Sequence, residues 1–142
     1  MSEHETPPTD HEPPTLLGLH VISREGDLHF IRINGPLRLE DAQHFHGAVA
    51  ESRRRYGSVY VLVDSSGAGA ITPETRRWIA EWNKTHHVNG VAIFGSSLVV
   101  RTLLTLVLHA IALLRSQAVP SVFVKDEAAA RAWLQDLRSL SG

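Results

Sequence analysis

The chain has 142 residues, of which 43% are hydrophobic and 20% are charged, a balance typical of one globular domain that buries a core. It contains no cysteine, which excludes disulfides, thiolate metal sites and cysteine nucleophiles. Its net charge of −1 argues against the strongly basic surface of a nucleic-acid-binding protein. Because the first residues lack a basic and then apolar leader, we expect a cytoplasmic location.

Residues 1–15, MSEHETPPTDHEPPT, are rich in proline and acidic residues and contain no lysine or arginine. Such a segment buries too little apolar surface to offset the entropy lost on ordering. We therefore expect a disordered acidic tail over residues 1–15, followed by a single domain over residues 16–142.

Two β-rich runs open this domain, at residues 16–23 and 28–34, and a glycine-containing turn at 24–27 separates them. This spacing predicts a hairpin. A helix is predicted over residues 39–57, because apolar residues recur on one helical face and Gly57 follows three arginines near its end.

The remainder of the chain alternates strands with helices. Continuous apolar runs at 58–63 and 90–95 are typical of strands covered on both faces, and a further strand is predicted at 119–124. Thr72-Pro73-Glu74 predicts a helix start, and further helices are expected at 97–116 and 126–140. The predicted fold is α/β in three layers, with four helices and a mainly parallel five-stranded sheet to which the hairpin adds one antiparallel strand.

The predicted helix at 97–116 is apolar on most of its circumference. One narrow stripe consists of Arg101, Thr105, His109, Ala112 and Ser116, and nearly every other position is Leu, Val, Ile or Ala. One face of a sheet cannot cover such a helix. Three interpretations stay open: a core or dimer helix, the wall of a lipid-like pocket, or insertion into a membrane.

Four residues are candidates for ligand binding. Trp78 and Trp82 lie one helical turn apart and belong either to the core or to the mouth of an apolar pocket. Arg101 and His109 mark the solvent side of the apolar helix or contact an anionic headgroup at the pocket mouth.

Motifs for catalysis and for metal binding are missing from the sequence. No G-x-S-x-G nucleophile turn occurs, and the nine histidines have no metal-binding pattern such as H-E-x-x-H. We therefore expect no enzyme activity, no catalytic residue, no metal and no cofactor.

Four stretches, REGDLHFIRINGPLRLEDAQ, YVLVDSSG, GVAIFGSS and DEAAARAWL, resemble the SpoIIAA-like family in sequence and in order. That family is related in fold to STAS domains and to CRAL-TRIO lipid-binding domains. The resemblance implies a small α/β domain, often oligomeric, without established catalysis and with a suspected role in binding apolar ligands or proteins.

The resemblance also draws attention to Asp64-Ser65-Ser66-Gly67. STAS anti-sigma-factor antagonists carry a D-S-S-G motif whose first serine is phosphorylated, which makes Ser65 and Ser66 candidate phosphorylation sites. In those proteins the motif caps a helix, whereas here it follows a predicted strand directly and Thr72 takes the capping position. We interpret DSSG mainly as a loop whose side chains bond to turn amides.

The sequence thus favours a non-enzymatic binding or regulatory module. Its expected partners are a lipid-like small molecule or a regulatory protein, with peripheral membrane contact and a homo-oligomer as further expectations, and nucleic acid is not expected. The alternative function is a phosphorylation switch at Ser65 or Ser66.

Overall fold

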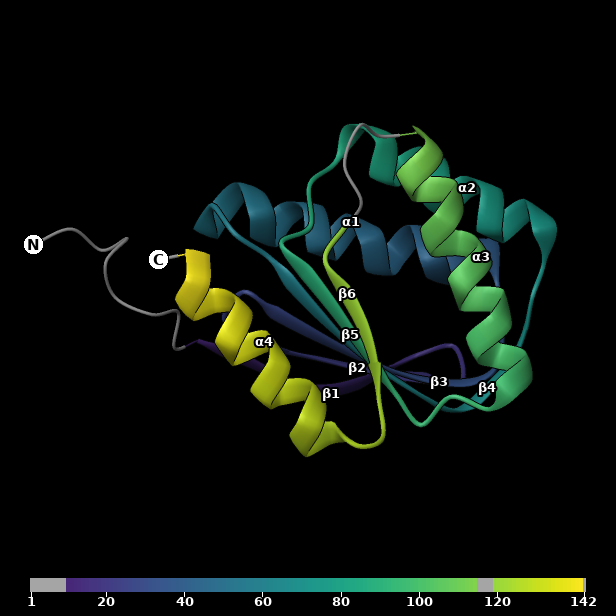
Figure 1. Ribbon diagram of the computed structural model, residues 1–142, viewed down its shortest axis with the longest axis horizontal. Helices are drawn as coiled ribbons and strands as arrows, with labels where there is room; N and C mark the ends of the chain where they lie inside the picture. The colour runs from purple at the N-terminus through teal and green to yellow at the C-terminus, as the bar shows by residue number, and fades with distance from the viewer. Residues whose placement is uncertain (1–9, 115–118, 142) are drawn as a thin grey trace, which may run out of the picture.

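Six strands and four helices make up the part of the chain that the computed structural model describes, residues 10–114 and 119–141. Three strands come first, and from there on helices and strands alternate along the chain (Figure 1). The strands are β1 His11–Leu17, β2 His20–Glu25, β3 Leu28–Leu37, β4 Tyr60–Ile71, β5 Gly90–Phe94 and β6 Ser121–Val124, and the helices are α1 Leu39–Tyr56, α2 Pro73–Thr85, α3 Leu98–Leu114 and α4 Glu127–Ser141.

The strands lie in the sheet in the order β1-β2-β3-β4-β5-β6. Strand β2 is antiparallel to both of its neighbours, whereas β3, β4, β5 and β6 pair in parallel. The α/β class is confirmed, and so is the interior position of the strands predicted at 58–63 and 90–95.

The sheet has six strands where the sequence predicted five. Strand β1 begins at His11, so the disordered tail expected over residues 1–15 is wrong for residues 11–15, and residues 1–9 lie outside the described residues. The run predicted as one strand at 16–23 divides at a turn where Gly18 has a φ of +60°. Strand β1 has no alternating apolar pattern and forms through backbone pairing with β2. Arg24 adds ion pairs at 3.0 Å to Asp10 and 3.2 Å to Glu12.

Strand β4 is also longer than predicted. It continues through Asp64-Ser65-Ser66-Gly67 to Ile71, so the interpretation of DSSG as a loop is wrong. Strand β3 likewise continues past Asn34 to Leu37, and the two strands stay paired, with irregular register, at Asn34–Gly67, Gly35–Ala68 and Leu37–Ile71.

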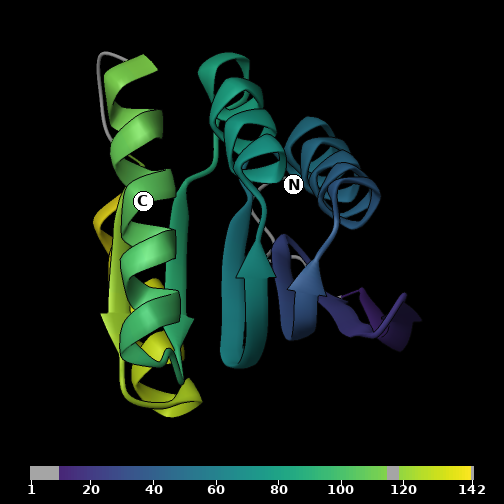
Figure 2. The same cartoon turned by 90° about the vertical axis from the view of Figure 1, so that its right-hand side faces the viewer.

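Helices α1, α2 and α3 cover one face of the sheet and α4 covers the other (Figures 1 and 2). The larger core lies under the three helices and includes Phe45, Ile79, Val107 and Ile111 from them. The smaller core joins Ala130 and Leu134 of α4 to the opposite face of β4 and β5. The chain therefore forms the three layers that the sequence predicted.

Local signals account for several helix boundaries. The Thr72 hydroxyl accepts a hydrogen bond from the Thr75 amide at 3.2 Å and Pro73 is the first helical residue of α2. Gly57 ends α1 with a φ of +79°. The Ser97 hydroxyl accepts from the Val100 amide at 3.2 Å at the start of α3.

Among the described residues, no helix is both long enough and apolar enough to cross a membrane. Helix α3 buries Val100, Val107 and Ile111, but other large apolar side chains on it remain in contact with solvent. These are Leu98, Val99, Leu106 and Leu113, with exposed fractions of 81%, 70%, 52% and 87%.

Candidate ligand-binding site

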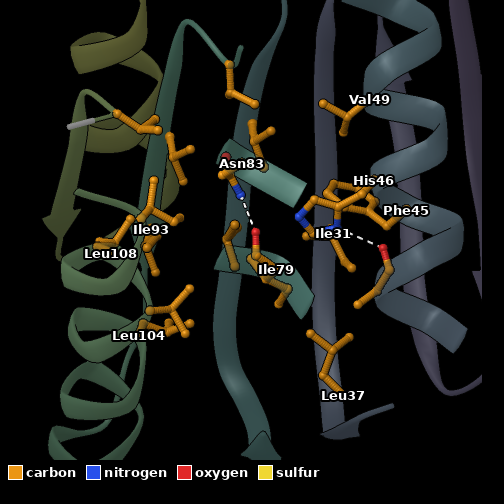
Figure 3. Close-up of a pocket in the computed structure, with 18 of the residues that line it drawn as sticks. Ile31, Leu37, Phe45, His46, Val49, Ile79, Asn83, Ile93, Leu104 and Leu108 are labelled. Carbon is orange, nitrogen blue, oxygen red and sulfur yellow. Dashed lines mark hydrogen bonds between the residues drawn. The ribbon is translucent and has the colours of Figure 1, made fainter. Parts of the chain in front are cut away.

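An apolar cavity of about 130 Å³ lies between the three-helix layer and the sheet (Figure 3). Strands β3, β4 and β5 form its floor, and helices α1, α2 and α3 form its walls. Its lining consists of Ile31, Ile33, Leu37, Ala42, Phe45, His46, Val49, Val61, Val63, Ile71, Ile79, Asn83, Val88, Val91, Ile93, Leu104, Val107, Leu108, Ile111 and Val119.

The sequence places short branched side chains on the floor of this cavity. Ile31 and Ile33 in β3, Val61 and Val63 in β4, and Ile93 in β5 alternate along their strands, so they share the face that the three helices cover. These side chains and those of the helices leave part of the layer between them unfilled. The result is a cavity inside the larger core.

His46 is one of only two polar side chains among the lining residues. It lies on α1, one turn after Ala42, and its Nδ1 is 2.7 Å from the Ala42 carbonyl oxygen. The His46 ring contacts Phe45, Trp78 and Trp82 edge-on, with centroid distances of 5.9, 5.4 and 4.7 Å. Burial among these rings lowers the pKa of His46 to about 4, so the imidazole is neutral at pH 7.

Asn83, on α2, is the second polar side chain of the lining. It is buried, and its Nδ2 donates a hydrogen bond to the Ile79 carbonyl oxygen at 2.9 Å. This bond holds the amide against its own helix at the edge of the cavity (Figure 3). No lysine, arginine or carboxylate is found among the lining residues, so the cavity suits a ligand without charge.

Trp78 and Trp82, two of the predicted ligand-binding residues, do not line the cavity. They contact the ring of His46, and Trp82 in turn stacks on His86 with centroids 4.1 Å apart and an interplanar angle of 3°. Both tryptophans are partly buried against the larger core. They therefore support the cavity wall through His46 rather than contacting a ligand in the cavity.

Arg101 and His109, the other two predicted residues, are exposed on α3 and are not part of the cavity lining. The Arg101 guanidinium lies over the Phe123 ring, 5.1 Å from its centroid. The structure does not bring these residues together with the two tryptophans into one site. Their place agrees with the expected polar, solvent-facing stripe, of which Ser116 lies outside the described residues.

The two serines of DSSG have different environments. Ser65 is 1% exposed, and its hydroxyl donates to the Phe94 carbonyl at 2.9 Å and lies 2.5 Å from the Ser96 hydroxyl. Ser66 is exposed, and its hydroxyl donates to Asp64 at 2.7 Å. The other carboxylate oxygen of Asp64 accepts a hydrogen bond from the Arg32 Nε at 3.1 Å. The pKa of Asp64 is lowered: burial raises it, but the hydrogen bonds from Ser66 and Arg32 outweigh burial.

Sequence reasoning did not find His46 and Asn83. A signal for each was present, because each lies four residues after a core residue of its own helix, Ala42 and Ile79 respectively. A polar side chain at that spacing faces the core instead of solvent. The described residues contain no group of histidine and acidic side chains that could hold a metal ion.

Comparison with known proteins supports the fold. A family model described as SpoIIAA-like matches residues 28–135. A solved structure described as an uncharacterized protein from the DUF3478 family with a SpoIIAA-like fold, from Shewanella loihica PV-4, matches with a TM-score of 0.55. The two chains are 16% identical, and the match covers 84% of this chain and 98% of the other. No curated protein matches the chain.

Proposed function

We propose that this chain, which belongs to the SpoIIAA-like family, is a non-enzymatic module that binds one small apolar ligand in the cavity under α1, α2 and α3. One observation carries the proposal: every lining side chain except His46 and Asn83 is apolar, and the cavity lies between the sheet and the three helices that cover it. Ligand sites in proteins are concave and mostly apolar, with a small number of polar groups that orient the ligand.

The packing around the cavity supports this proposal. Unfilled volume in a core costs up to about 24 cal/mol per Å³, so about 130 Å³ corresponds to at most roughly 3 kcal/mol of stability that a ligand can restore. A ligand that fills the cavity restores the missing dispersion contacts with the surrounding side chains. The folded protein therefore gains stability from a ligand of matching size.

The volume limits the size of the ligand. A dry cavity of about 150 Å³ accepts a benzene-sized molecule. The cavity at about 130 Å³ accommodates one small ring or a short branched chain, and a complete fatty acid would require α3 to move outward. Of the lipid-like ligands expected from the sequence, only small apolar molecules fit this volume.

Thermal unfolding with benzene as the probe tests this function. A probe at ten times its dissociation constant stabilises the folded state by about 1.4 kcal/mol, which raises the Tm by about 5 °C in a chain of this length. Native mass spectrometry of the purified protein provides a second measurement, because a ligand retained from the cell adds to the mass.

Two variants serve as cavity-blocked forms. Val107→Phe and Leu104→Phe each extend a lining side chain into the cavity and should abolish the benzene effect while the far-UV circular dichroism stays unchanged. The proposal fails if benzene leaves the Tm of the wild-type protein unchanged and no bound ligand is detected. It also fails if the cavity-blocked forms respond to benzene as the wild type does.

A phosphorylation switch is the alternative function, and the exposure of Ser66 is the observation in its favour. Ser65 is buried and bonded to the backbone, so a kinase would reach it only after β4 opened. A phosphate on Ser66 would face the Asp64 carboxylate and be repelled by it. Phosphopeptide mass spectrometry of protein from its native cells checks this alternative, and phosphate at Ser66 would support it.

A further inference from the structure

We infer that the cavity selects neutral ligands that carry a hydroxyl group, such as phenols and small alcohols, because His46 and Asn83 offer hydrogen-bonding groups matched to a hydroxyl. This inference rests on the proposed function and adds the chemical class of the ligand. Three observations carry it: the tautomer of His46, the direction of its free nitrogen, and the composition of the lining.

The hydrogen bond to the Ala42 carbonyl determines the tautomer of His46. A carbonyl oxygen only accepts hydrogen bonds, so the Nδ1 that lies 2.7 Å from it carries the hydrogen. The ring is neutral, since burial lowers its pKa to about 4. Its Nε2 is therefore unprotonated and acts as an acceptor.

Figure 3 shows the ring of His46 projecting from α1 into the cavity, with its second nitrogen directed toward Ile79 and Asn83. Among residues 10–114 and 119–141, the hydrogen bond found for His46 is that of its Nδ1, and no fully buried side-chain nitrogen is without a partner, so the Nε2 is open to a water-sized molecule. The aromatic rings of Phe45, Trp78 and Trp82 hold the imidazole in place. An acceptor is thus fixed at the wall of an apolar cavity, where a ligand donor is its natural partner.

Asn83 completes the recognition of a hydroxyl. Among the described residues, the hydrogen bond found for the Asn83 side chain is that from its amide to the Ile79 carbonyl, which leaves a second N–H donor and the oxygen acceptor. A hydroxyl group both donates and accepts. It can donate to the Nε2 of His46 and, in a suitable position, accept from the Asn83 amide.

The same groups disfavour two other ligand classes. A carboxylate has no donor for the Nε2 of His46, and no lysine or arginine among the lining residues compensates its charge. A pure hydrocarbon fills the volume but leaves the Nε2 without a partner. We therefore expect phenol to bind more tightly than benzene, and benzoate to bind more weakly than both.

Calorimetric titration with benzene, phenol and benzoate tests the inference on the wild-type protein. One hydrogen bond to a neutral acceptor in an otherwise apolar cavity corresponds to roughly a tenfold difference in dissociation constant, so phenol should bind about tenfold more tightly than benzene. The ¹⁵N chemical shift of the His46 Nε2 should move on addition of phenol and stay unchanged with benzene. This spectroscopic readout needs no variant.

His46→Phe should bind benzene and phenol equally, while His109→Phe, the matched change of an exposed histidine, should keep the preference for phenol. Asn83→Leu is a second variant in case His46→Phe does not fold, and it should reduce the preference. Benzene binding without a preference for phenol would overturn this inference and leave the proposed function standing. Failure of both probes to bind would overturn the two together.

Discussion

At the scale of single residues, the buried His29 and the partly buried His46 are both held in the neutral form. Burial lowers the pKa of His29 to about 4, with a contribution from the nearby charge of Arg24, and lowers that of His46 to the same value. The His29 Nε2 lies 2.6 Å from the Ser52 hydroxyl. Protonation of either ring therefore costs more free energy in the folded protein than in the unfolded chain.

Stability should consequently fall as the pH falls from about 6.5 to 4. In this window the unfolded chain binds a proton on each of the two histidines and the folded protein does not, so protons favour unfolding. Each histidine contributes a slope of about 1.4 kcal/mol per pH unit. Urea unfolding at a series of pH values measures this dependence.

Carboxylates whose pKa is lowered act at more acidic pH. Hydrogen bonds from Tyr56 and Arg24 lower the pKa of Asp10 to about 2, so its stabilising effect is lost as the pH falls through that value.

The histidine prediction is tested with two variants. His29→Gln should reduce the slope of stability against pH between pH 6.5 and 4, and the exposed His109→Gln should not. An unchanged slope in His29→Gln would contradict the assignment.

At the scale of elements, the pairing of β3 with β4 beyond Asp64 depends on glycine. A Cβ added to Gly69 would lie 2.9 Å from the Gly35 carbonyl carbon and 3.0 Å from the Pro36 nitrogen. These are backbone atoms, which do not move aside as a flexible side chain does. The close approach of the two strands after the DSSG motif is therefore possible only without a side chain at position 69.

Gly69→Ala should destabilise the protein by about 1–3 kcal/mol, the usual cost of forcing extra atoms into a packed region. Gly47→Ala is the matched control, because a Cβ there meets nothing within 4 Å and Gly47 lies inside α1. The control should stabilise by roughly 0.5–1 kcal/mol. Urea unfolding compares the two, and equal effects of the same sign would refute the close-approach argument.

At the scale of the whole molecule, the outer side of α3 is the largest departure from a covered fold. Val99, Leu106 and Leu113 are exposed and follow one another at intervals of seven residues, so they lie along one side of the helix. Seven-residue spacing is the pattern with which helices pair with one another. We therefore propose a second copy of the chain as the partner of this surface.

The expected outcome is a dimer in sedimentation experiments at micromolar concentration. The double variant Leu106→Glu/Leu113→Glu should sediment as a monomer, because two charges would be buried in the interface. Leu140→Glu changes a leucine on α4 that is as exposed as Leu113, and this variant should stay dimeric. A wild-type monomer that binds anionic lipid vesicles would instead favour the peripheral membrane contact expected from the sequence.

Much of the architecture was predictable because its signals are local. Thr72-Pro73 defines the start of α2, Gly57 defines the end of α1, and the continuous apolar runs identify β4 and β5 as interior strands. Strand β1 was missed for the opposite reason. It contains two prolines and few apolar residues, and it forms through backbone pairing with β2 and the ion pairs of Arg24.

The candidate site was only partly predictable. The sequence indicated a ligand pocket or a subunit interface formed by α3 and the tryptophan helix, and the structure has a cavity under α1, α2 and α3. It placed the contacts on Trp78, Trp82, Arg101 and His109, whereas the cavity is lined by His46 and Asn83 instead. The prediction selected exposed and aromatic residues and missed the polar side chains that face the cavity.

The sequence by itself determined the α/β class, the order of the helices and of strands β2 to β6, and the family, because periodicity, capping residues and turn residues act over a few neighbouring positions. Only the tertiary structure decided that β4 runs on through DSSG, that Ser65 is buried, and that His46 faces a cavity. These features depend on distances between elements far apart in the chain. A void in the core arises from how six elements pack together, and no local pattern encodes it.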